Sequence, residues 1–62
     1  MKKIKIINCR KRSGYRQEDV AKLLNIKQNT YSRKESGKSR FTIDEITMLT
    51  HIFKVTYDDL LN

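Results

Sequence analysis

Apolar residues recur at helical spacing in several stretches of the chain, and short polar segments separate these stretches. The most regular pattern lies between residues 43 and 53. Thr42 and Glu45 form a capping box just before it, which predicts a helix over about 43–53. Its apolar stripe is expected to form the centre of the core and consists of Ile43, Ile46, Leu49, Ile52 and Phe53.

Two further helices are predicted in the first half of the chain. Ile6, Cys9 and Ser13 share one helical face, so a helix is expected over about 2–12, ended by Gly14. A second is expected over about 17–24, with acidic residues in its first turn and Asn25 in a left-handed turn after it. Its apolar positions are Val20, Ala21, Leu24 and Ile26.

The segment 28–36 is also expected to be helical, although it has almost no apolar face. Tyr31 is its main apolar residue, and Gly37 is expected to stop the helix. Near the end of the chain, Thr56 and Asp59 repeat the capping pattern before two leucines, which predicts a short last helix. The fold class is therefore all-α, with five helices in one domain over 1–62.

One alternative concerns the start of the chain. The alternation in "KIKI", residues 3–6, could instead begin a strand, although no partner strand is evident. Ile4 and Ile7 form a second apolar edge on the first helix, which either packs under the last helix or remains exposed. Met48 and His51 lie beside the stripe of the fourth helix and are expected at its surface.

Charge is distributed unevenly along the chain, whose net charge is +7. Residues 1–40 hold 13 of the 14 Lys and Arg against three acidic residues, or +10, and residues 41–62 hold one Lys against four acidic residues, or −3. This division into a basic N-terminal part and an acidic C-terminal part favours a polyanionic partner that binds one side of the domain. Charge alone is also compatible with solubility or binding to a membrane surface.

Several classes of protein and site are made improbable by the composition. Cys9 is the only cysteine, so an internal disulfide is impossible and the thiol is expected to fill core volume; a redox or intermolecular role is the alternative. No apolar run is long enough for a membrane span and no signal peptide is evident, so a cytoplasmic location is expected. No catalytic constellation, cofactor motif or metal-ligand cluster is visible, and an enzyme is not expected.

The helices 17–24 and 28–36, joined by a turn of about three residues, have the dimensions of a helix-turn-helix. The residues "GYRQEDVAKLLNIKQNTYSRKESGK" and the continuation "TIDEITMLTHIFKVTYDDLL" resemble the phage repressor and Cro proteins, the XRE family. The resemblance covers nearly the whole chain. It implies a lambda repressor-like domain of five helices whose third helix enters the DNA major groove while the second lies across the backbone.

The resemblance makes the polar side chains of helix 28–36 candidates for reading bases. Gln28 and Asn29 can each bridge the N6 and N7 edge of adenine, and Arg33 can bridge O6 and N7 of guanine. Ser32 is a fourth candidate. The alternative is that these are ordinary solvent-facing residues or that they contact phosphate.

Gln17 matches a family position that contacts phosphate from the start of the second helix. Arg16, Lys27, Lys38 and Arg40 are further phosphate candidates by their placement. Lys2, Lys3 and Lys5 are weaker candidates, because the first helix usually faces away from the groove.

Arg10 and Glu35 match a family pair that forms a salt bridge between the first helix and the end of the third. The role is structural, so neither residue is expected to contact DNA. Removing one partner of a deeply buried pair can cost about 3–5 kcal/mol.

Four positions depart from the family pattern. Arg16 and Lys27 stand where Thr or Ser usually caps a helix, a loss that typically costs about 1 kcal/mol at each site. We hypothesise that these cations exchange stability for affinity to phosphate. Lys34 and Phe41 replace a common apolar residue and a common proline, and Phe41 is expected to fill volume that Lys34 gives up.

Three functions compete. The first is a sequence-specific regulator that binds double-stranded DNA, of the repressor type of a phage or mobile element, acting as two copies on half-sites one helical turn apart. The second is a protein-interaction module, such as an antitoxin-like partner, and the third is nonspecific nucleic-acid or RNA binding. No separate ligand or dimerisation domain is expected after Asn62, so any homodimer is expected to be weak, to use the helical domain and to form only on DNA.

Overall fold

The computed structural model describes residues 2–61, and the side chains of residues 6–60. Its helices are α1 (Lys2–Ser13), α2 (Gln17–Leu24), α3 (Gln28–Glu35), α4 (Ile43–Phe53) and α5 (Tyr57–Leu61). These bounds agree with the predicted ranges to within one or two residues, and no strand occurs between residues 2 and 61. The all-α prediction is confirmed, and the alternative of a strand at "KIKI" is wrong because these residues lie in α1.

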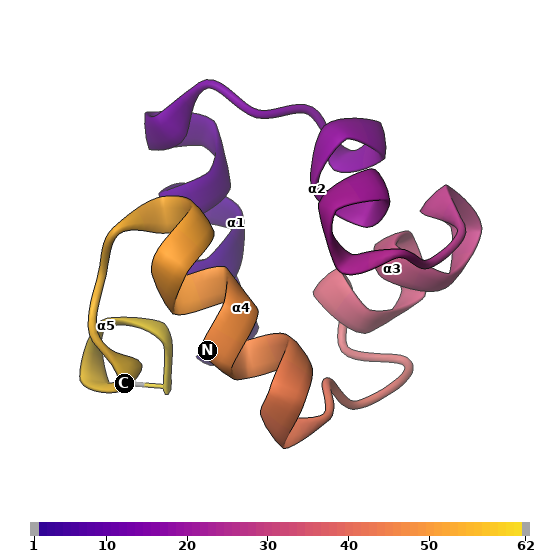
Figure 1. Ribbon diagram of the computed structural model, residues 1–62. Helices are drawn as coiled ribbons and strands as arrows, with labels where there is room; N and C mark the ends of the chain where they lie inside the picture. Colours follow the sequence, from indigo (N-terminus) through magenta and orange to yellow (C-terminus); the bar gives the residue numbers. More distant parts are fainter. Residues whose placement is uncertain (1, 62) are drawn as a thin grey trace.

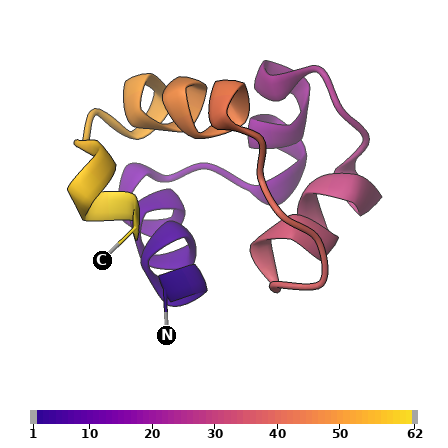
Figure 2. The same ribbon diagram turned by 90° about the horizontal axis from the view of Figure 1, so that it is seen from below.

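The helices form two groups, and α4 of one group contacts α2 of the other. In Figure 1, α2 and α3 lie together on the right, and α1, α4 and α5 lie on the left. The same grouping holds when the molecule is seen from below in Figure 2. Helix α1 packs against α5 and α2 packs against α3, whereas α4 contacts α1, α2 and α5. The helix-turn-helix pair is therefore held on a support made of the other three helices.

The core is small and draws on every helix. Tyr31, Val20, Leu49 and Leu60 are fully buried, and Cys9 is 7% exposed among them. The burial of Cys9 confirms its expected place in the core. The other buried members are Ile6, Ala21, Leu24 and Phe53.

The predicted apolar stripe of α4 is correct in part. Leu49 and Phe53 are buried, and Ile46 and Ile52 are half-buried against the core. Ile43 is 76% exposed, so its assignment to the core was wrong. Ile43 is the first residue of α4, and helical periodicity does not show how far the neighbouring helices cover that end.

Boundary positions on α1 and α4 also differ in burial. His51 and Met48 are exposed, as predicted. Ile7 is half-buried, which favours packing over a free apolar surface at that position. The side chains of Ile4, Lys2, Lys3 and Lys5 lie outside the described residues, so the predictions for them stay untested.

Backbone conformation accounts for where the helices stop. Asn25 after α2 adopts a left-handed conformation with φ of 60°, as predicted. Lys54 after α4 does the same, with φ of 57°, although it is not a residue type that favours this region. Gly37, which was predicted to stop α3, has a φ of 93°, which a residue with a side chain rarely adopts.

Both predicted capping boxes are present. The Thr42 hydroxyl accepts the Glu45 backbone N–H at 3.1 Å, and the Glu45 carboxylate accepts the Thr42 N–H at 2.8 Å. Thr56 and Asp59 form the same two bonds before α5. Within the described residues, no helix is long and apolar enough to cross a membrane.

Candidate nucleic-acid interface

Helices α2 and α3 form the predicted pair, joined by the three residues Asn25, Ile26 and Lys27. The Ile26 backbone N–H donates to the Ala21 carbonyl at 2.9 Å, and the Ile26 side chain is half-buried against the core. These contacts fix the turn at its centre. The start of α3 is therefore presented at the surface in a defined direction.

The first turn and outer side of α3 carry the predicted base-contacting residues. Gln28, Asn29 and Arg33 are exposed, and Ser32 is half-buried. Tyr31, on the opposite side of the helix, is fully buried. No hydrogen bond or ion pair of the Gln28, Asn29 or Arg33 side chains occurs within the described part of the chain, so these groups face solvent with their donors and acceptors available.

Four of the five predicted phosphate-contacting side chains are exposed. They come from the start of α2, from the turn and from the loop between α3 and α4, and they are Arg16, Lys27, Lys38 and Arg40. The fifth, Gln17, is half-buried, and its amide Nε2 donates to Glu35 Oε1 at 2.7 Å. Since an amide nitrogen carries two hydrogens, one donor of Gln17 remains for a phosphate.

Glu35 at the end of α3 is the centre of a buried polar network. Arg10 donates to its two carboxylate oxygens, from Nε at 2.7 Å and from Nη2 at 3.3 Å. Tyr31 donates its hydroxyl at 2.8 Å. The Glu35 side chain thus receives donors from α1, α2 and α3, and it is 2% exposed as a residue. The predicted Arg10–Glu35 salt bridge is present.

Electrostatics within this network favour the charged forms of both partners. Burial disfavours the Glu35 carboxylate and is the largest single influence, yet the hydrogen bonds from Arg10, Gln17 and Tyr31 outweigh it and lower the pKa of Glu35. The hydrogen bond to Glu35 raises the pKa of Arg10. Burial, with the neighbouring Glu35 charge, raises the pKa of Tyr31, which therefore stays a neutral donor.

Arg10 also ties the network to the loop before α2. Its Nη1 donates to the Tyr15 carbonyl at 3.0 Å. The Tyr15 ring in turn lies 6.3 Å from the Phe53 ring, centroid to centroid. The start of α2 is thereby joined to both α1 and α4, and the position of Gln17 depends on these contacts as well as on Glu35.

Lys34 is paired in a way that the sequence did not indicate. Its Nζ lies 2.6 Å and 2.8 Å from the two carboxylate oxygens of Glu45 in α4. The hydrogen bond from Lys34 and that from the Thr42 N–H lower the pKa of Glu45 against the opposing effect of burial, which is the largest single influence. Phe41 packs on Tyr31, with ring centroids 5.8 Å apart. The departure at Lys34 is therefore accommodated by an ion pair, and Phe41 is half-buried against the core.

The two unusual N-caps differ from each other. Neither Arg16 nor Lys27 makes a side-chain capping bond, as their chemistry requires. At α2, however, the Asp19 carboxylate accepts the Arg16 backbone N–H at 2.9 Å, which preserves the reciprocal half of a capping box. At α3, the equivalent position holds Thr30, which is exposed, and the first turn contains no acidic residue. The start of α3 is thus the less stabilised of the two.

Sequence reasoning missed most partners in these networks. One signal existed for Tyr31, which precedes Glu35 by four residues and so shares its helical face. No comparable signal joined Gln17 to Glu35 or Lys34 to Glu45, because those contacts depend on how the helices cross. Among the described residues, no group of three or more His, Cys, Asp or Glu side chains could hold a metal ion.

Comparison with known proteins agrees with this geometry. A family model described as helix-turn-helix matches residues 6–60. The HTH-type transcriptional regulator AnsR of Bacillus subtilis (strain 168) is 33% identical over 57 residues, which cover 92% of this chain and 49% of AnsR. The chain thus spans about half the length of this relative. No solved structure gives a significant match.

Proposed function

The chain belongs to the helix-turn-helix family, and we propose that it is a sequence-specific regulator that binds double-stranded DNA with α3 in the major groove. The observation that carries the proposal is the contrast between the two sides of α3. Tyr31 and Glu35 fix the helix to its support, while Gln28, Asn29 and Arg33 project unbonded polar groups into solvent. Polar groups on a rigid helix are what base recognition requires.

The proposed contacts divide by chemistry. Gln28 and Asn29 form paired hydrogen bonds with adenine, Arg33 forms them with guanine, and Ser32 contributes a shorter contact. Arg16, Lys27, Lys38 and Arg40 bind phosphates and set the orientation of the domain. Gln17 binds a phosphate through the amide hydrogen that Glu35 leaves available. None of these contacts requires a cofactor or a small-molecule ligand.

The regulatory role follows from this binding. We propose a repressor-type protein of a phage or mobile element. Two copies occupy half-sites about one helical turn apart and either block access to a promoter or recruit other proteins to it. The family match and the relative, which is named a transcriptional regulator, support regulation. The excess of positive charge in residues 1–40 supports an anionic partner.

Selection from a random pool of double-stranded oligonucleotides tests the proposal most directly. The expected result is enrichment of one sequence, arranged as an inverted repeat, that retains its advantage over random DNA as salt is raised. A phosphate-only binder loses affinity steeply with salt and enriches nothing. Absence of enrichment at moderate salt would contradict sequence-specific binding and favour nonspecific binding instead.

Two substitutions then separate base contacts from phosphate contacts. Arg33→Ala is expected to relax preference at one base pair, at a cost of about 1–3 kcal/mol there, because the guanine contact is lost. Lys38→Ala is the matched control on the same surface and is expected to weaken all sequences alike. Binding to the selected site and its single-base variants measures both effects. Equal weakening of every sequence by Arg33→Ala would reassign that residue to phosphate.

A further inference from the structure

One ion pair joins the end of α3 directly to the first turn of α4. Lys34 Nζ lies 2.6 Å and 2.8 Å from the two carboxylate oxygens of Glu45, and each side chain is only 13% exposed. Glu45 Oε1, one of these two oxygens, also accepts the Thr42 backbone N–H at 2.8 Å. A side chain of α3 is therefore linked, through one carboxylate oxygen, to the last residue of the loop before α4.

The loop over residues 36–42 is consequently attached to α3 at both ends. Near its start, the backbone N–H groups of Lys38 and Ser39 donate to the Arg33 carbonyl at 2.9 Å and 3.3 Å. Its end is attached by the ion pair and the backbone bond just described. The loop carries two of the predicted phosphate contacts, the exposed side chains of Lys38 and Arg40.

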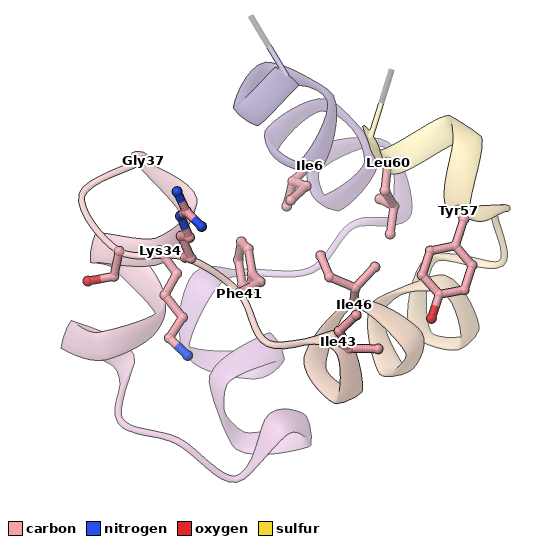
Figure 3. A pocket seen from close by; sticks show the side chains of 10 residues that line it. Ile6, Lys34, Gly37, Phe41, Ile43, Ile46, Tyr57 and Leu60 are labelled. Atoms are coloured by element: carbon pink, nitrogen blue, oxygen red, sulfur yellow. The ribbon is translucent and has the colours of Figure 1, made fainter.

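Packing supports this loop only in part. The Phe41 ring lies 5.8 Å from the Tyr31 ring, centroid to centroid. Gly37, Arg40 and Phe41 also line an open groove of about 450 Å³, which Figure 3 shows beside the labelled Phe41 and Lys34. Because side chains of the described residues do not fill this groove, the position of the loop depends on Phe41 and on the bonds at its two ends.

We propose that Lys34 and Glu45 are positioning residues for DNA binding, whose ion pair fixes the loop over residues 36–42. The fixed loop holds Lys38 and Arg40 in one arrangement toward the phosphates, so that less order has to be gained when DNA binds. The pair acts through the loop and not by contact with DNA. This inference rests on the proposed function and adds the residues that arrange its phosphate contacts.

Removing the Glu45 charge separates this role from general electrostatics. Glu45→Gln raises the net charge by one, so long-range attraction alone predicts tighter binding to DNA. Loss of the ion pair predicts the opposite, about fivefold weaker binding, because two long side chains must then be ordered on binding. The glutamine keeps an oxygen that can accept the Thr42 N–H, so the first turn of α4 retains that bond.

Asp44→Asn is the matched control. Asp44 is the exposed carboxylate next to Glu45, it lies in the same first turn of α4, and it belongs to no ion pair within residues 6–60. The substitution makes the same change in net charge and leaves the Lys34 pair intact. This variant is expected to bind DNA at least as tightly as the wild type.

Affinity for a random-sequence DNA duplex at low salt measures these effects, because phosphate contacts carry no sequence information. Lys34→Arg is expected to keep wild-type affinity, since a guanidinium also pairs with a carboxylate. The double variant Lys34→Met/Glu45→Gln has the net charge of the wild type and leaves neither charge unpaired, so it should be more stable than Glu45→Gln. It should nevertheless bind about fivefold more weakly than the wild type, which a role in stability alone does not predict.

Nuclear magnetic resonance relaxation of the backbone amides tests the loop without DNA. In Glu45→Gln and in the double variant, the ¹H–¹⁵N heteronuclear Overhauser effect is expected to fall for residues 38–42 and to stay unchanged in α1 and α2. Lys34→Arg and Asp44→Asn should keep the wild-type values throughout.

Three outcomes overturn the inference: an unchanged loop in Glu45→Gln, a Glu45→Gln affinity equal to that of Asp44→Asn, and a double variant that binds as tightly as the wild type. These outcomes can be told apart from failure of the proposed function. A wild-type chain that does not bind the duplex overturns the proposed function and the positioning role together. An unchanged loop in a Glu45→Gln variant of a chain that does bind overturns the positioning role alone.

Discussion

The two halves of α3 are held in opposite ways. Tyr31, near the middle of the helix, is fully buried, and the second half is fixed by Glu35, whose carboxylate accepts hydrogen bonds from three helices. Its first half has no side-chain cap at Lys27, no acidic residue in its first turn, and exposed amides at Gln28 and Asn29. The second half of α3 therefore fixes the position of the helix, whereas the backbone N–H groups of its first turn lack capping partners. A phosphate group bound at this end would supply the missing interactions.

The largest effect on stability is expected from removing the contacts of Glu35, which hold the second half of α3. Glu35→Gln removes the charge that pairs with Arg10 while keeping the side-chain shape, and it leaves a largely buried guanidinium without its counter-ion. The expected loss is about 3–5 kcal/mol in the free energy of unfolding. Domains have about 0.05–0.15 kcal/mol of stability per residue, or about 3–9 kcal/mol for 62 residues, so this loss removes a large part of the stability.

Urea denaturation followed by circular dichroism measures this loss. Glu18→Gln is the control, because Glu18 is an exposed carboxylate in the first turn of α2. Its loss is expected to stay within about 1 kcal/mol, the limit for a charge near an exposed helix end. A Glu35→Gln variant as stable as the control would mean that the network does not hold α3 in place.

Acid should weaken the ion pairs of Glu35 and Glu45, which hold the second half of α3, without any substitution. The pKa of Glu35 and that of Glu45 are both lowered in the folded chain from the ordinary value of 4.5. A carboxyl group whose pKa falls on folding contributes stability that is fully present above the unfolded pKa. That contribution disappears as pH falls below 4.5 and through the lower, folded pKa.

Thermal melting between about pH 2.5 and pH 7 checks this dependence. The melting temperature is expected to be level above about pH 5.5 and to fall steadily below 4.5. In Glu45→Gln, one of the two carboxylates is gone, so the variant should start from a lower melting temperature and lose less of it in acid. An acid loss equal to that of the wild type would show that the Lys34–Glu45 pair contributes nothing to it.

The smallest effect on stability is expected from improving the N-caps of α3 and α2. Lys27→Ser supplies a capping hydroxyl and removes an unfavourable cation at the start of α3, with an expected gain of about 1 kcal/mol. Arg16→Thr should give a smaller gain, because the Asp19 carboxylate already accepts the Arg16 N–H at 2.9 Å. Thermal melts of the two variants measure the difference.

The same two variants test the exchange of stability for affinity. Both should bind DNA more weakly than the wild type at moderate salt, and each should lower the dependence of log affinity on log salt by about 0.9. Unchanged affinity in Lys27→Ser, or a greater stability gain in Arg16→Thr than in Lys27→Ser, would contradict the contrast drawn between the two helix starts.

Local sequence signals predicted most of the fold. The Thr42–Glu45 and Thr56–Asp59 boxes and the turn at Asn25 are short-range features that hydrogen-bond within a few residues, so the sequence specified them almost alone. The Arg10–Glu35 pair was anticipated from the resemblance, because the two residues are 25 positions apart and no periodic pattern connects them.

What the sequence could not predict depends on how the helices cross. The bonds from Gln17 to Glu35 and from Lys34 to Glu45 span 18 and 11 positions and exist only because α2 and α4 meet α3 at particular angles. Ile43 was misassigned for the same reason, since periodicity shows which face a residue occupies but not where the covering helices stop. The base and phosphate contacts stay predictions; all of these side chains are exposed except Gln17 and Ser32, which are half-buried.

The burial of Cys9 gives the molecule an internal reporter. It is the only cysteine in the chain and is 7% exposed in the core beneath α1. A thiol reagent reaches such a group mainly in molecules that have opened, so the labelling rate measures how often the core becomes accessible. Binding of any partner to the closed form slows that rate by mass action. One unmodified thiol can therefore reveal a bound operator or a second copy without an added probe.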